Sequence, residues 1–195
     1  SYSDRTIVFV PVTLAATAAT GDVTLDFAID YQACDDSICM APTTAKASVV
    51  VKVAADGAAS KPNEEATFAK FDASVFSKVG KNAAPAGAGD ASGAPGVMSA
   101  SAVPQRTPVF PGDQFAVAIV MDFDETWHAW PNKPVPPKGF EDVTLFPTVI
   151  RLAKDAGGKE SPIPSGWKVH LDRLQWPAPH VITTAGLTGT PLEIL

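Results

Sequence analysis

The sequence is poor in the residues and patterns that several large functional classes need. It has only two cysteines and three histidines among 195 residues. No basic cluster is present, and no apolar run approaches the ~20 residues of a membrane span. The formal net charge is −6, and basic and aromatic residues do not interleave, so we expect no nucleic-acid partner. The sequence also lacks a GxSxG motif or another nucleophile–base arrangement that would indicate a hydrolase.

Metal chemistry has little support in the sequence. None of the histidines, His128, His170 and His180, is spaced with the cysteines as zinc sites require. We therefore expect no metal and no cofactor. Copper(I) is the remaining metal alternative, because that ion is bound by thiolate, thioether and imidazole groups. Its ligands would come from Cys34, Cys39, Met40 and His128.

Proline is abundant and long helical periodicities are rare. Eighteen prolines favour short strands joined by turns, and a hydrophobic content of 46% suffices for a core. Pro11, inside the first alternating segment, suggests an edge strand or a bulge there. We predict an all-β protein whose strands, from period-2 alternation, lie at residues 6–14, 23–31, 45–53, 114–123, 143–152 and 167–176.

The middle of the chain, residues 54–105, has a different composition. Glycine, alanine, serine and proline dominate it, as is typical of a flexible linker. Within it, a polar segment at 63–65 precedes apolar residues at roughly helical spacing. We expect a short helix docked on a domain surface rather than a ligand site. Its apolar residues are Phe68, Phe71, Val75, Phe76 and Val79.

The two cysteines follow an alternating strand and lie on either side of a short polar segment. Asp35, Asp36 and Ser37 supply turn chemistry between Cys34 and Cys39, so the segment predicts a hairpin that a disulfide would close. Such a bond spans few residues and constrains little of the unfolded chain, so it contributes little as a structural cross-link. An exposed pair at a loop tip suits reversible exchange better. A structural disulfide remains the alternative.

The residues around the pair indicate a weak nucleophile. Asp35 and Asp36 lie beside Cys34, and nearby negative charge disfavours a thiolate. No lysine or arginine lies between Tyr31 and Thr44, and no CxxC motif opens a helix. The pair therefore fits a shuttle whose partner supplies the activated thiol or the reducible disulfide.

The run YQACDDSICMAP at residues 31–42 resembles the active-site hairpin of a known family. That family is the N-terminal periplasmic domain of the thiol:disulfide interchange protein DsbD and its relatives, and the resemblance extends to Tyr2–Arg5 and Val10–Leu14. It implies an immunoglobulin-like β-sandwich whose cysteine pair relays reducing equivalents, as part of a protein-disulfide reductase system. It also implies that Cys39 forms the mixed disulfide with partners and that Cys34 resolves it.

The same resemblance implies a setting for the protein. Its partners would be thioredoxin-like redox proteins and a membrane-embedded electron-transfer domain outside this sequence, with a link to cytochrome c biogenesis. We expect a periplasmic or otherwise exported protein, with any export signal outside the sequence. An aromatic turn would shield the disulfide, although its tryptophans alternatively belong to the core. The active-site surroundings would be Tyr31, Asp35, Asp36, His128 and Trp130.

The order of the segments is unusual. Residues 106–195 resemble the first half of the DsbD-like domain and residues 1–53 its second half, with 54–105 between them. The chain is either a junction between tandem domains or one sandwich completed from two halves in permuted order, within a chain or by exchange. We predict completion, because a half-sandwich leaves long edges and an open core face. The alternative function is an immunoglobulin-like binding or structural module with an inert disulfide.

Overall fold

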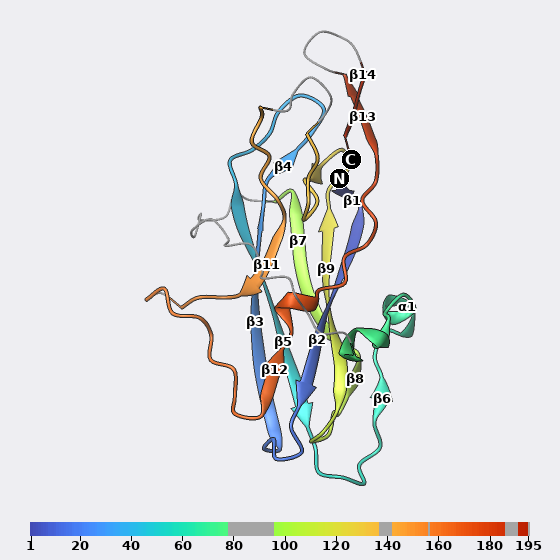
Figure 1. Ribbon diagram of the computed structural model, residues 1–195, viewed down its shortest axis with the longest axis vertical. Helices are drawn as coiled ribbons and strands as arrows, with labels where there is room; N and C mark the ends of the chain where they lie inside the picture. The colour runs from blue at the N-terminus through green and yellow to red at the C-terminus, as the bar shows by residue number, and fades with distance from the viewer. Residues whose placement is uncertain (78–95, 137–141, 156, 186–190, 195) are drawn as a thin grey trace.

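The computed structural model describes residues 1–77, 96–136, 142–155, 157–185 and 191–194, and it consists mainly of β-strands (Figure 1). Paired strands within its sheets run antiparallel. Two larger sheets face each other across a common hydrophobic core. The predicted all-β class is confirmed, and the arrangement is sandwich-like.

The four-stranded sheet has the strand order β12-β2-β9-β7. Its longest pairing joins β2 and β9, from Arg5 opposite Asp122 to Thr13 opposite Gln114. On the other side of β2, the short strand β12 pairs only near the end of β2. The strands are β2 (Arg5–Leu14), β7 (Met98–Pro104), β9 (Gln114–Phe123) and β12 (Trp167–Val169).

The three-stranded sheet has the order β11-β3-β5. Strands β3 and β5 pair along their whole length, from Gly21 opposite Val53 to Tyr31 opposite Thr43. This long hairpin carries the cysteine segment at one end of the molecule (Figure 1). The strands are β3 (Gly21–Tyr31), β5 (Thr43–Val53) and β11 (Val149–Leu152).

The core lies between these sheets and follows the alternation of the sequence. In β9, the residues from Phe115 to Met121 are all fully buried, because odd-numbered side chains enter the main core and Ala116 and Ala118 pack on the opposite face. In β3, Leu25, Phe27 and Ile29 enter the same core. Burial of large apolar side chains from both sheets is the main stabilising contribution to such a structure.

Both large sheets combine strands from the first and the second half of the chain. Strand β2 pairs with β9, and β3 pairs with β11, so the segment 1–53 shares its core with the segment 98–169. Each sheet thereby covers edges that one segment alone would leave unpaired. Whether these segments are complementary halves of a DsbD-like domain stays a prediction.

Smaller elements complete the chain. A three-stranded sheet with the order β1-β10-β4 lies at the cysteine end. Two-stranded pairs form between β6 and β8 and between β13 and β14. Their bounds are β1 (Tyr2–Ser3), β4 (Ala33–Cys34), β6 (Lys61–Pro62), α1 (Glu65–Phe68), η1 (Ala73–Ser77), β8 (Arg106–Thr107), β10 (His128–Ala129), η2 (Leu171–Arg173), β13 (Ile182–Ala185) and β14 (Pro191–Ile194).

Several boundaries differ from the sequence-based expectations. The strands expected at 143–152 and 167–176 are shorter, with only β11 and β12 paired. Residues 98–104, which we assigned to the linker, form β7, because their small alternating side chains pack beside β9. The expected helix consists of two short turns, α1 and η1, and Val79 lies outside the described residues.

Helical structure is confined to short turns in the described part of the chain. Phe68 and Phe71 pack on Phe9, on the outer face of the four-stranded sheet, with ring centroids 5.7 and 5.5 Å from that of Phe9. This contact docks the α1 segment on the sheet. None of the described helices is long and apolar enough to cross a membrane.

Candidate functional site: the cysteine hairpin

The predicted disulfide between Cys34 and Cys39 is present, with 4.0 Å between the two α-carbons. It closes the tip of the segment that joins β3 to β5, at the upper end of the molecule in Figure 1. Cys34 ends β4, and Cys39 faces it as an isolated antiparallel bridge partner. The disulfide therefore spans two backbone positions that already lie opposite each other.

Hydrogen bonds hold the tip independently of the sulfur–sulfur bond. The backbone N–H of Asp35 donates to the Ile38 carbonyl at 2.9 Å, and that of Met40 donates to the Ala33 carbonyl at 2.8 Å. Asp35 Oδ1 accepts the backbone N–H groups of Ser37 and Ile38, each at 2.7 Å. The N–H groups of Ile38 and Ser37 lower the pKa of Asp35, so its carboxylate stays ionised and closes the turn.

The two cysteines differ sharply in their exposure. Cys34 is only 2% exposed and packs with Trp130 and partly buried Leu145. Cys39 is exposed, and it follows Ile38, whose side chain is 60% exposed. An incoming group from solvent therefore has access to the Cys39 side of the disulfide and meets packed side chains on the Cys34 side.

His128 is brought next to the disulfide by strand pairing. Strand β10 lies between β1 and β4 and places His128 directly opposite Cys34. Directly opposite residues of an antiparallel pair carry their side chains on the same face. Burial lowers the pKa of His128, which favours the neutral imidazole, while Asp36 and Asp35 act in the opposite direction.

The remaining residues of the predicted site have different surroundings. Trp130 is 7% exposed and packs against Cys34, so the aromatic turn does reach the disulfide. Tyr31 lies in the main core, where its ring meets Phe123 edge-on at 6.4 Å, and burial raises its pKa. Asp36 is exposed at the tip. Of this set, Trp130 and His128 lie beside Cys34, whereas Tyr31 contributes to the sandwich.

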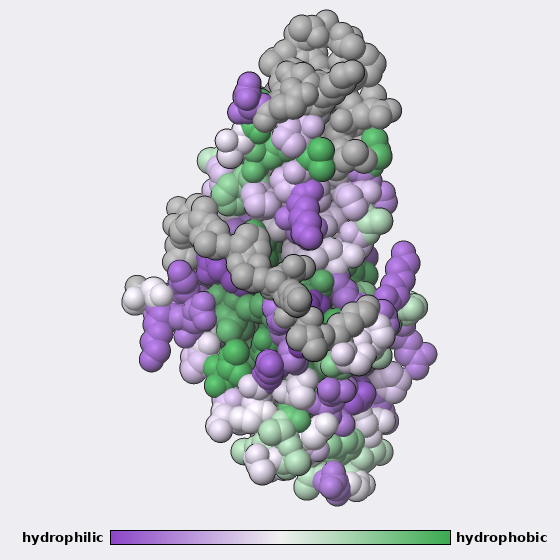
Figure 2. All heavy atoms as spheres, in the orientation of Figure 1, coloured by the Kyte–Doolittle hydropathy of each residue, from purple (hydrophilic) through white to green (hydrophobic). Residues whose placement is uncertain are grey.

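Sequence reasoning missed the contribution of residues 142–147 to this end of the molecule. Leu145, which packs with Cys34, lies in a stretch that alternates like a strand, and nothing local marks it as a neighbour of the hairpin. Val135 and Val143 are 56% and 48% exposed. Figure 2 shows hydrophobic residues at the surface of this upper end, beside the grey segments.

The oxidised hairpin does not assemble the copper(I) ligands considered above. Both sulfurs belong to the disulfide, and thiolates rather than disulfide sulfurs bind such metals. Within the described ranges, no three histidine, cysteine or acidic side chains are grouped as a metal site would require.

No protein-family model, curated protein or solved structure matches the chain. The likeness to the DsbD N-terminal domain therefore rests on sequence motifs, and the functions inferred from it are proposals.

Proposed function

We propose that the protein is a thiol:disulfide exchange domain in which a thioredoxin-like partner attacks the Cys34–Cys39 disulfide at Cys39. The observation that carries this proposal is the difference in exposure, with Cys34 buried against Trp130 and Cys39 exposed. Exchange proceeds by in-line attack of a thiolate on one sulfur, so access selects the sulfur that is attacked.

The proposed step conserves atoms and electrons. A partner thiolate forms a bond to Cys39 Sγ, the bond between the two cysteine sulfurs breaks, and Cys34 leaves as a thiolate that takes up a proton. The second thiol of the partner then attacks the partner's first cysteine sulfur in the mixed disulfide. This forms the partner's disulfide and releases Cys39 as a thiol. Two electrons pass from the partner's dithiol to this pair. In the reverse direction, Cys39 attacks a partner disulfide and Cys34 resolves the adduct.

The hairpin favours repeated cycling between the two redox states. Its tip is held by backbone hydrogen bonds and by Asp35, none of which involves a sulfur atom. Breaking the disulfide therefore leaves the two thiols on opposed positions of the same bridge. A reduced pair held in this way re-forms its bond without a long loop-closing search.

The electrostatics of the site favour a partner that supplies the reactive thiol. Asp35 and Asp36 follow Cys34 in the turn, and burial lowers the pKa of His128, which favours its neutral form. Neither feature stabilises a thiolate at Cys34. The neutral imidazole instead fits an acceptor for the proton of the Cys34 thiol when Cys34 resolves a mixed disulfide.

The family resemblance extends the proposal beyond the hairpin. We infer an immunoglobulin-like sandwich completed from two halves in permuted order, in the periplasm or another exported location. Its partners would be thioredoxin-like proteins and a membrane-embedded electron-transfer domain outside this sequence. The pairing of β2 with β9 and of β3 with β11 supports completion, because it joins strands from the segments 1–53 and 106–195.

The test is to trap the mixed disulfide with single-cysteine variants. The partner is a thioredoxin-like protein that lacks its resolving cysteine and whose remaining cysteine carries thionitrobenzoate as a mixed disulfide. Cys34→Ser leaves the exposed thiol, which should displace thionitrobenzoate and form the protein–protein disulfide, whereas Cys39→Ser leaves the buried thiol and should react poorly. Non-reducing gels give the adduct yields, and the double serine variant is the control for non-covalent association. Equal trapping by both variants would contradict the role of exposure.

The inert-module alternative has its own readout. A structural disulfide should have a reduction potential below about −300 mV, whereas an exchanging one should be more oxidising. Trapping by neither variant, together with a potential in the structural range, would replace the exchange function with a binding or structural one.

A further inference from the structure

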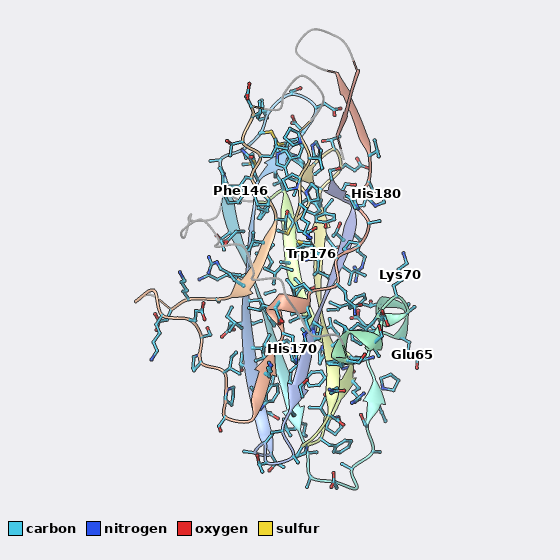
Figure 3. All side chains as sticks on the ribbon, in the orientation of Figure 1. Glu65, Lys70, Phe146, His170, Trp176 and His180 are labelled. Carbon is cyan, nitrogen blue, oxygen red and sulfur yellow. A yellow bond between two sulfur atoms is a disulfide. The ribbon has the colours of Figure 1, made fainter. Side chains whose placement is uncertain are left out.

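A groove with a volume of about 580 Å³ lies on the outer face of the four-stranded sheet, away from the disulfide residues. Its floor includes Ile7 and Phe9 of β2 together with Trp176. Residues of the α1 segment form one wall, and the segment from 175 to 180 forms the other. Figure 3 shows Lys70 beside α1, and it shows Trp176 and His180 on the segment 175–180, which runs alongside β2. A volume of this size suits a drug-sized ligand or a few residues of an extended peptide.

The groove borders a strand edge that the protein leaves unpaired. Phe9 exchanges two backbone hydrogen bonds with Gln175, each 3.0 Å long, on the side of β2 that faces away from β9. Because backbone groups alternate in an antiparallel pair, the N–H and C=O groups of Ile7 and Arg5 face the same side. No described residue forms a backbone hydrogen bond with Ile7 on that side.

Prolines explain why the chain does not cover this edge itself. If the antiparallel register of the Phe9–Gln175 bridge continued, residue 177 would lie opposite Ile7 and residue 179 opposite Arg5. Both positions are proline, which has no N–H to donate to a strand. Among the described residues, the next backbone hydrogen bonds of this segment are with Ser1, whose carbonyl accepts the backbone N–H of His180 at 2.8 Å and whose amine donates to the His180 carbonyl at 2.6 Å.

The lysine and arginine side chains give the groove charges of one sign. Arg5 and Lys70 line it together with His180, and none of the described lining residues is aspartate or glutamate. This contrasts with the formal net charge of −6 for the whole chain. Arg5 has only an exposed ion pair with Asp122 at 3.4 Å, and no described carboxylate pairs with Lys70. The groove therefore presents cations that a ligand carboxylate would match.

The neutral polar groups of the lining are already used within the protein. Gln175 donates to the Asp72 carbonyl and accepts the Asp72 backbone N–H. The Tyr2 hydroxyl donates to Asn132 Oδ1 at 2.7 Å, and its ring stacks on Trp176 with 5.7 Å between centroids. The unmatched features are thus Lys70, the apolar floor and the edge of β2.

We propose that this groove binds an extended acidic peptide segment of a partner protein, which adds as a strand to the edge of β2 at Arg5–Ile7. Backbone hydrogen bonds to the edge would supply affinity, an apolar side chain would rest on Trp176 and Phe9, and a carboxylate would lie between Arg5 and Lys70. The site is separate from the disulfide, so this interaction does not require the proposed redox function.

The test uses the full chain and a defined probe, the peptide Thr-Val-Glu-Val-Thr-amide with fluorescein attached to its N-terminal amine. Fluorescence anisotropy at low salt should show saturable binding that weakens about tenfold when Lys70→Glu reverses the charge in the groove. Lys46→Glu is the matched control, because Lys46 is exposed on β5 of the other sheet and the net charge changes equally. That variant should bind within about twofold of the wild type.

Two altered peptides separate the contributions. Replacing the glutamate by glutamine should weaken binding about tenfold, and methylating the backbone nitrogens that face the edge should weaken it about tenfold as well. Amide NMR spectra should show shifts at Ile7 and Arg5 that follow the anisotropy titration.

The outcomes that overturn the proposal are distinct. Equal weakening by Lys70→Glu and Lys46→Glu would indicate non-specific charge attraction. Full retention of affinity by the methylated peptide would exclude strand addition and leave a small-anion site. A concentration-dependent dimer that the peptide does not displace would make a second copy of the chain the occupant. Absence of saturable binding up to about 1 mM would reject the site.

Discussion

The ion pair between Asp30 and Arg151 joins β3 to β11 on the face of the three-stranded sheet that points away from the main core. Asp30 lies on β3 and is 1% exposed, whereas Arg151 lies on the neighbouring strand β11. Arg151 Nε donates to Asp30 Oδ2 at 2.7 Å, and Nη2 donates to Oδ1 at 3.0 Å. The Thr44 hydroxyl also donates to Oδ1, at 2.6 Å. Both carboxylate oxygens are therefore hydrogen-bonded in a buried, bidentate arrangement.

Arg151→Met keeps much of the side-chain length but removes the positive charge. It leaves the buried carboxylate of Asp30 with the Thr44 hydroxyl as its remaining donor among the bonds described above. Removing one partner of a buried pair costs about 3–5 kcal/mol, out of a total stability of about 5–15 kcal/mol for a native protein. The double variant Asp30→Leu/Arg151→Met should be more stable than Arg151→Met alone, because it leaves no unpaired buried charge.

Urea unfolding followed by tryptophan fluorescence measures these differences, with the disulfide kept intact. The control is Arg5→Met, because the Arg5–Asp122 pair also joins two strands that are distant in sequence, β2 and β9, but its side chains are 54% and 44% exposed. An exposed pair contributes about 0–1 kcal/mol. A loss below about 1 kcal/mol for Arg151→Met would mean that the pair is not buried, and it would refute the pairing of β11 with β3 that brings the two side chains together.

Two further predictions concern the hairpin and the docked segment. The pKa of Asp35 lies below its ordinary value of 3.8. The Asp35 carboxylate therefore stabilises the turn fully above the ordinary pKa, and this stabilisation is lost as the pH falls through the lowered pKa. In urea titrations, the stability difference between wild type and Asp35→Asn should therefore shrink only below about pH 4, and a difference that changes between pH 5 and 7 would contradict this role. Phe9→Ala removes the ring on which Phe68 and Phe71 pack, so it should destabilise the protein by about 3 kcal/mol and accelerate proteolysis within residues 63–77, and unchanged proteolysis would contradict this docking.

The long strands of the core were predictable from the sequence because their alternation is strong. Residues 114–123 alternate large apolar and smaller side chains, and the structure buries the large ones between the sheets. The hairpin was predictable for a similar local reason. Asp35 and Ser37 supply turn chemistry, and the cysteines lie where two strands approach, so both the turn and the disulfide are present.

Strand lengths depended on partners that lie far away in the sequence. Residues 143–148 alternate like a strand, but the register of β11 would place Pro147 opposite residue 32, where β3 has already ended. Pro11 suggested an edge strand or a bulge, yet β2 lies inside its sheet. Pro11 has no N–H to donate, and the position of that group lies on the side where β12 ends. The Pro11 carbonyl still accepts the N–H of His170. A period-2 pattern shows which side chains share a face, but not whether a neighbouring strand is available.

The sequence by itself determined the all-β class, the faces of the long strands and the cysteine hairpin, because each depends on side chains two to five residues apart. Only the tertiary structure decided that Cys34 is buried and Cys39 exposed, since Trp130 and Leu145 come from distant segments. It also decided that the edge of β2 at Ile7 meets a groove lined by Lys70 and His180. Local patterns specify conformation, whereas exposure and the grouping of charges depend on which distant strands pack together.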